Sequence, residues 1–119
     1  PLYSSAASDV YKRQEYAPSM PEMLEETRKI LCDGVELFMA RDKEQAKEFY
    51  KRDDKIDDLF NQVKEELVAC LKEGKKDTDA CVDLLMVAKY LERIGDHAVN
   101  ISEWEVFKET GSIKNERIL

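Results

Sequence analysis

Acidic residues four positions apart are the feature of this sequence that could do chemistry. On a helix, two such carboxylates lie on one face about one turn apart, so both can reach a single cation. Several of these pairs occur among the 26 acidic residues, as chance alone produces on the solvated helix faces of so acidic a chain. Most have a Lys or Arg within one turn, as Glu44 and Glu48 do, and therefore indicate ordinary surface.

Asp53 and Asp57 depart from that pattern. Asp53 falls at an apolar position between Phe49 and Ile56, and neither aspartate has a Lys or Arg three or four residues away. A group outside this helix must therefore neutralise the pair.

Glu92 and Asp96 form the second unusual pair. Glu92 interrupts an apolar row, and Lys89 and Arg93 are only partial partners for the two acids. Gly95 stands between the acids, where it costs about 1 kcal/mol relative to Ala in a helix interior. Such a glycine indicates that another segment approaches closely.

An amide follows each pair one turn later, Asn61 in one case and Asn100 in the other, so each pair begins a polar stripe. If the two helices are antiparallel neighbours, the stripes can face each other. Four carboxylates on an apolar interface must either raise their pKa values or bind a cation. Oxygen ligands favour hard or borderline cations such as Mg, Mn, Ca or Fe. The alternative is that one or two of the acids pair with Lys or Arg from another helix.

Three helices are predicted to carry these residues. The first spans about residues 20–40, because Ser19 and Glu22 match a capping box and Pro21 presets the first turn. Its apolar positions recur with the helical period: Met20, Leu24, Thr27, Leu31, Gly34 and Phe38, with Met23, Ile30 and Leu37 beside them.

The second predicted helix begins with an N-cap at Asp42 and ends near residue 73, before Gly74. One polar residue interrupts its apolar row: Ala46, Phe49, Asp53, Ile56, Phe60, Val63, Leu67, Cys70.

The third predicted helix begins at Asp77 or Thr78 and ends near Gly111. It carries two neighbouring apolar rows, so it must contact two partners. Because the connections are short, consecutive helices run antiparallel. The sequence thus predicts an all-α fold, an antiparallel three-helix bundle in up-down-up order.

Size and composition limit the possible functions. The 119 residues make one domain, and 19 basic against 26 acidic residues give a net charge of −7, which disfavours binding to nucleic-acid phosphates. The longest clean apolar run, Leu84–Ala88, is far shorter than the roughly 20 residues that span a bilayer, and no secretory signal is expected. Cys32, Cys70 and Cys81 form no CxxC pair and are expected to be core thiols of a protein in a reducing compartment.

Motifs of familiar enzyme classes are missing from the sequence. A ferritin-like di-iron site needs Glu-x-x-His, but the residue three before His97 is Ile94. There is no Gly-rich phosphate loop and no GxSxG nucleophile motif. His97 and Trp104 are expected to be packing or interface residues. We therefore expect no enzymatic activity.

Two segments resemble the PhoU family of bacterial phosphate-transport regulators. They are RDDKIDDLF at 52–60 and LLMVAKYLERIGDHAVNI at 84–101, and the likeness extends over about residues 15–119. The D-x-x-x-D and E-x-x-x-D sequences within them match the family's signatures. The resemblance implies a three-helix bundle repeated twice in tandem, in which these signatures hold metal ions. Carried over to this sequence, the metal ligands are Asp53, Asp57, Glu92 and Asp96.

Only one repeat is present here, and it resembles the C-terminal one. We expect a PhoU-like bundle over 15–111, a disordered or foreign tail over 1–14, and a C-terminal tail over 112–119. The helix surface that packs on another repeat would then be open, and a homodimer would cover it.

The resemblance also implies a cytoplasmic regulator at the inner face of the membrane. Such a protein acts negatively on the phosphate ABC transporter, through its ATPase, and on the phosphate-sensing histidine kinase. We expect it to bind a divalent or trivalent metal ion, Mg, Mn or Fe. The alternative is a metal-free helical adaptor whose acidic surface docks a basic patch on either partner. A carboxylate-bridged redox enzyme is disfavoured, because histidine ligands are missing.

Overall fold

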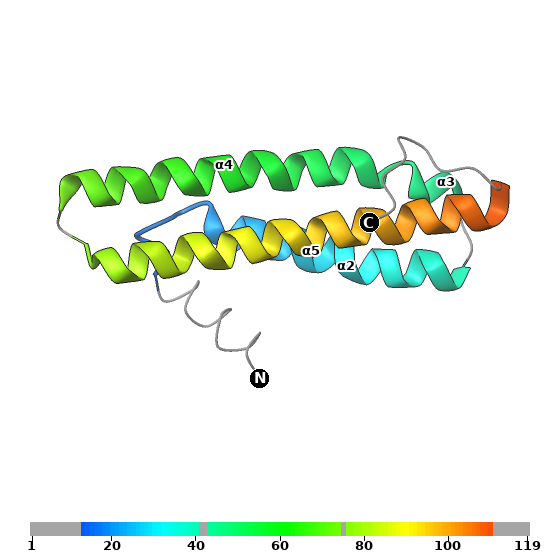
Figure 1. Cartoon of the computed structure of the whole chain (residues 1–119), viewed down its shortest axis with the longest axis horizontal. Coiled ribbons are helices and arrows are strands. Elements are labelled where there is room, and N and C mark those ends of the chain that lie inside the picture. Colours follow the sequence, from blue (N-terminus) through cyan, green and yellow to red (C-terminus); the bar gives the residue numbers. More distant parts are fainter. Residues whose placement is uncertain (1–12, 41–42, 75, 111–119) are drawn as a thin grey trace.

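The computed structural model describes residues 13–40, 43–74 and 76–110. Its helices are α2 (Met20–Ala40), α3 (Lys43–Ala46), α4 (Phe49–Glu73) and α5 (Thr78–Thr110). The three long helices lie side by side and run up, down and up, with the short α3 at one end (Figure 1). The predicted all-α three-helix bundle is confirmed. The predicted tails fall outside the described residues, except for Arg13 and Gln14.

Helix α5 is the centre of the packing. It contacts both α2 and α4 along its length, as its two apolar rows predict, and α2 and α4 also touch each other. The buried core draws on all three long helices; its larger members are Met20, Met23, Ile30, Leu37, Phe49, Ile56, Val63, Leu67, Leu84 and Leu91.

The core-facing side of α2 is narrower than predicted. Ile30 and Leu37 are buried, whereas Leu31 and Phe38 are 38% and 47% exposed. The prediction is wrong for these two residues because apolar side chains cover a wider sector of α2 than the bundle can bury. A similar shift on α4 buries Leu59 and leaves Phe60 half-buried.

The predicted capping box at the start of α2 is also wrong. The backbone N–H of Ser19 donates to Glu66 Oε1 at 2.9 Å, and its hydroxyl donates to Glu66 Oε2 at 2.7 Å. Glu22 lies 3.6 Å from Lys55 Nζ instead. The partly buried Glu66 carboxylate of α4 therefore accepts the Ser19 N–H, which the capping box would pair with Glu22.

The single helix predicted from Asp42 onward is broken into α3 and α4, and Asp42 itself lies outside the described residues. At the break, the N–H of Glu48 donates to the carbonyl of Gln45 at 3.0 Å, a tighter turn than in an α-helix. Both Ala46 and Phe49, three residues apart, are buried across this turn.

The turn between α4 and α5 agrees with the sequence. Gly74 ends α4 with φ 69°, and its N–H donates to the carbonyl of Cys70 at 3.3 Å. Asp77 is the N-cap of α5, because its Oδ1 accepts the N–H groups of Asp79 at 3.0 Å and Ala80 at 3.4 Å. This short turn makes α4 and α5 antiparallel neighbours, as facing acidic pairs require.

Two of the three cysteines are core thiols. Cys70 and Cys81 are buried near the α4–α5 turn, and burial raises the pKa of the Cys81 thiol. Cys32 is exposed on α2, so the expectation is wrong for that residue.

Over the described ranges, every helix is too short or too polar to cross a bilayer.

Candidate metal centre

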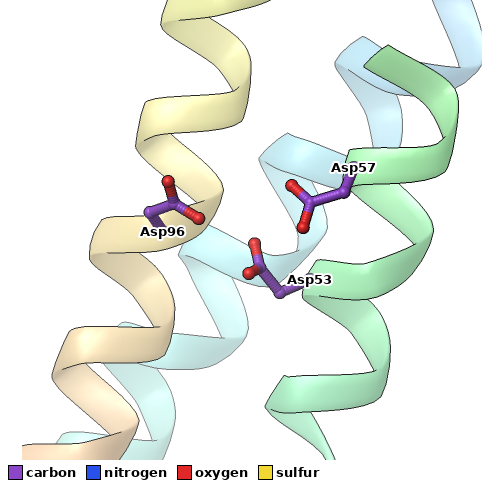
Figure 2. A group of neighbouring side chains, drawn as sticks. All are labelled: Asp53, Asp57 and Asp96. Carbon is purple, nitrogen blue, oxygen red and sulfur yellow. The ribbon is translucent and has the colours of Figure 1, made fainter. Parts of the chain in front are cut away.

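Three aspartates converge between α4 and α5. Asp53 and Asp57 lie one turn apart on α4, and Asp96 faces them from α5 (Figure 2). One carboxylate oxygen from each of them lies within 4.8 Å of the others. Two oxygens bound to one ion are separated by at most twice the bond length, about 4 to 5 Å for Mg or Ca. The spacing therefore suits a single shared cation.

Asp53 is the deepest of the three carboxylates, with 4% of its surface exposed. It is buried because the helical period places it between Phe49 and Ile56 on the core-facing side of α4. Gly95 makes this position possible, since a Cβ atom there would lie 3.2 Å from Asp53 Oδ1 and 3.2 Å from Ile56 Cδ1. The close approach inferred from Gly95 is thus present, and its neighbour is the candidate ligand itself.

Asp57 carries the clearest electrostatic sign of the cluster. Its pKa is raised from 3.8 to about 6, first by burial, then by repulsion from Glu92 and Asp96, and by a hydrogen bond to Glu92. Two carboxylates can share a hydrogen bond only when one of them holds a proton. The cluster therefore favours an added positive charge, supplied by a proton or by a metal ion.

Glu92 lies beside this cluster but is not one of the three converging groups. Its Oε1 accepts a hydrogen bond from Lys89 Nζ at 2.6 Å, one turn back on α5. That ion pair partly neutralises Glu92, as its neighbours in the sequence suggest. Of the four predicted ligands, the structure brings three together and holds the fourth next to Asp57.

Basic residues near the cluster on α4 are directed toward α2. Arg52 forms an ion pair with Asp33 at 2.9 Å, and Lys55 contacts Glu26 at 3.1 Å. Elsewhere Lys47 lies 3.6 Å from Glu44, as expected for an ordinary surface pair. These contacts link α2 to α4 and leave the facing surfaces of α4 and α5 rich in acid.

The outer members of the two stripes differ in burial. Asn61 is exposed and Asn100 is half-buried, and His97 is exposed on α5. Trp104 is 40% exposed and packs edge-on against Phe107, with ring centroids 5.4 Å apart.

Sequence reasoning missed two buried acids near the end of α5. Glu103 and Glu105 are 2% and 0% exposed, and neither belongs to the three converging groups. The signal was available for Glu105, because the apolar row of α5 that ends at Ile101 reaches Glu105 with its next step of four residues.

Comparison with known proteins finds relatives that are named for phosphate transport. The PhoU domain model matches residues 20–104. An accessory protein of the phosphate-specific transport system from Methanothermobacter thermautotrophicus, PhoU homolog 1, is 38% identical over 81 residues, which cover 68% of this chain and 37% of that protein.

Two bacterial relatives carry the same description. The PhoU homolog of Clostridium acetobutylicum is 30% identical over 100 residues, covering 84% of this chain and 46% of that protein. The homolog of Zymomonas mobilis is 34% identical over 100 residues, covering 84% of this chain and 42% of that protein. The chain thus spans less than half the length of each of these three relatives. No solved structure gives a significant match.

Proposed function

The chain belongs to the PhoU family, and from this we propose that it is a metal-binding, non-enzymatic accessory protein of phosphate transport. The metal ion, Mg, Mn or Fe, is held by Asp53, Asp57 and Asp96, with Glu92 as a fourth oxygen donor. The observation that carries this proposal is the convergence of three carboxylates on one point of a mostly apolar helix seam. When bound, the ion supplies the positive charge that the raised pKa of Asp57 indicates is needed.

The proposed targets are the ATPase of the phosphate ABC transporter and the phosphate-sensing histidine kinase. The protein would act negatively on both from the cytoplasmic side of the inner membrane. Support comes from the names of the relatives, which describe accessory proteins of the phosphate-specific transport system. Because those relatives are more than twice as long as the matched segment, their activity is extended to this chain as a proposal.

Metal binding is tested by thermal unfolding of chelator-treated protein before and after adding Mg, Mn or Fe ions. An ion that binds only the folded state adds about 2.7 kcal/mol at one hundred times its Kd. The double variant Asp53→Asn with Asp96→Asn should lose this stabilisation.

A matched control uses a second acidic pair on α4. Asp54 and Asp58 are exposed and have the same i, i+4 spacing. The variant Asp54→Asn with Asp58→Asn removes the same charge and should keep the full metal-induced shift. An unchanged melting temperature in the parent protein, or equal shifts in both double variants, would remove the metal proposal.

A second candidate function is a metal-free adaptor that binds a basic surface of its partner. It is favoured by the Lys89–Glu92 ion pair, which partly neutralises the acid beside the cluster without a metal, and by the net charge of −7. Pull-down of the purified transporter ATPase or kinase in chelator separates the two functions. Undiminished capture in chelator supports the adaptor, whereas capture that requires added metal supports the first proposal.

A further inference from the structure

Lys89 of α5 contacts both of the helices that hold the candidate metal centre. Its Nζ donates a hydrogen bond to Glu92 Oε1 at 2.6 Å on the same helix. The same Nζ lies 5.1 Å from the centre of the Phe60 ring on α4. A cation within about 6 Å of an aromatic ring centre is attracted to the face of the ring. The ammonium group is therefore held beside the metal centre by one group from each helix.

The register of α4 and α5 places Lys89 at one end of the acidic cluster. The two helices are antiparallel, and Asp57 faces Glu92 across the seam. One turn closer to the connection between α4 and α5, Phe60 faces Lys89. Along α5, Glu92 therefore lies between Lys89 and the converging aspartates.

Glu92 is the acid that Lys89 and a metal ion would both bind. It is the proposed fourth oxygen donor of the metal centre, yet its Oε1 already accepts the Lys89 ammonium. The affinity of an all-oxygen site depends on the number of charged ligands. An ammonium on Glu92 cancels part of the charge that attracts the ion, and it repels an ion that approaches. Lys89 therefore lowers the metal affinity while it is bound to Glu92.

This contact can be exchanged without unpacking the core. The Lys89 side chain is 52% exposed, whereas that of Glu92 is 16% exposed. The ammonium can therefore move outward while the carboxylate stays in the seam. Lysine suits such an exchange, because its charge lies at the end of a flexible four-carbon stem. Phe60 keeps the ammonium within reach, so that it returns when the ion leaves.

We propose that Lys89 is a tethered counter-ion that competes with the metal ion for Glu92 and thereby sets the metal affinity of the site. In the metal-free protein its ammonium neutralises Glu92, and on metal binding Glu92 turns from Lys89 to the ion. This inference rests on the proposed metal-binding function but not on which ion is bound.

Titration calorimetry of chelator-treated protein with Mn ions, after the chelator is removed, tests the competition. Lys89→Met keeps the length of the stem and removes its charge, so it should lower the metal Kd by about 10-fold or more. Lys89→Arg keeps the charge, and its Kd should equal or exceed that of the parent protein.

A matched control removes the same charge from an ion pair outside the site. Lys47 lies 3.6 Å from Glu44, and these two residues are three positions apart, as Lys89 and Glu92 are. Neither belongs to the converging acids. Lys47→Met should therefore leave the metal Kd close to that of the parent protein.

A second comparison shows whether Lys89 acts through Glu92. In a protein that already carries Glu92→Gln, adding Lys89→Met should change the metal Kd no more than Lys47→Met does. A large remaining effect would mean that Lys89 acts without Glu92, and it would overturn the competition.

Thermal unfolding gives a readout that separates this role from simple stabilisation. In chelator, Lys89→Met should melt below the parent protein, because Glu92 loses its counter-ion. With excess Mn the order should reverse, because the tighter site gains more from the ion. A variant that melts lower under both conditions would show that Lys89 only stabilises the fold.

The calorimetric outcomes also distinguish this inference from the metal proposal. If the parent protein binds Mn but Lys89→Met has the same Kd, or the same change in Kd as Lys47→Met, only the competition is overturned. Weaker binding by Lys89→Met would mean that Lys89 orients Glu92 for the ion, which also contradicts it. If neither protein binds Mn, Mg or Fe ions, both proposals fail.

Discussion

The two halves of the α4–α5 seam are built from the same helices but differ in chemistry. Near the turn that joins them, Leu67 and Cys70 of α4 and Cys81 and Leu84 of α5 are all buried. Further along, the seam contains the converging carboxylates of Asp53, Asp57 and Asp96.

The difference between the two halves separates stability from binding. Each square ångström of apolar surface buried stabilises the fold by about 25 cal/mol, whereas a buried carboxylate costs free energy unless a positive charge or hydrogen bonds compensate it. We infer that the apolar half holds α4 and α5 together. The acidic half therefore need not stabilise the fold when no cation is bound. The raised pKa of Asp57 indicates that its charges repel one another in that state.

The largest expected effect is in the apolar half. Leu67→Ala should lower the free energy of unfolding by about 2–5 kcal/mol, because Leu67 is 2% exposed and its removal leaves a cavity. Urea denaturation in chelator measures it. Leu71→Ala, an identical change on the same helix at a 42% exposed position, should cost less than about 1 kcal/mol.

The apolar and acidic halves of the seam would not differ in this way if the acidic half stabilised the metal-free fold as much as the apolar half does. Asp53→Asn keeps the shape of the side chain and removes one of the repelling charges. In chelator it should therefore leave stability unchanged or increase it. A loss as large as that of Leu67→Ala would contradict the division.

A smaller effect is expected in the pH dependence of stability. Because the folded-state pKa of Asp57 is raised from 3.8 to about 6, the folded protein holds a proton that the unfolded chain has released. The contribution of Asp57 is therefore fully present below pH 3.8 and is lost as pH rises through about 6. The melting temperature of the parent protein in chelator, minus that of Asp57→Asn, should fall across this window.

Metal ions should reverse that trend, because they compete with the same proton. With saturating Mn, the difference between the parent protein and Asp57→Asn should grow as pH rises through about 6. A difference that is flat with pH, both in chelator and with Mn, would show that Asp57 titrates as an ordinary surface acid.

The smallest expected effect on stability is that of Gly95→Ala. The new Cβ would lie 3.2 Å from both Asp53 Oδ1 and Ile56 Cδ1, so the fully buried Ile56 must shift slightly. The higher helix propensity of Ala contributes about 1 kcal/mol in the opposite direction, and we expect the net change in unfolding free energy to stay below about 1 kcal/mol.

Metal affinity should respond more strongly to Gly95→Ala than stability does. A displaced Asp53 carboxylate weakens metal binding by about 10-fold or more, measured by titration calorimetry. Gly34→Ala is the control, since its Cβ would meet Phe49 at 3.3 Å and Ala98 at 3.8 Å rather than an acid. Equal effects of the two variants on metal affinity would mean that Gly95 serves packing alone.

Local pattern was enough to predict the three long helices and the three aspartates of the acidic cluster. The step of three and four residues defines the helices, Gly74 and Asp77 define the turn, and an aspartate in an apolar row must be buried. Gly95 predicts the close approach of another helix, because a glycine inside a helix is unfavourable unless a neighbouring segment requires the space. These features depend on residues within a few positions of one another, so periodicity captures them.

Only the tertiary structure decided which partner each polar side chain contacts and which apolar side chains at the edge of the core are buried. Ser19 bonds to Glu66 rather than completing its local box, Glu92 keeps Lys89 while three aspartates converge, and Leu31 and Phe38 remain exposed. Each of these choices is a competition between a neighbour along the chain and one across the bundle. Its outcome depends on the rotation of each helix about its axis, which only the packing of all three helices sets.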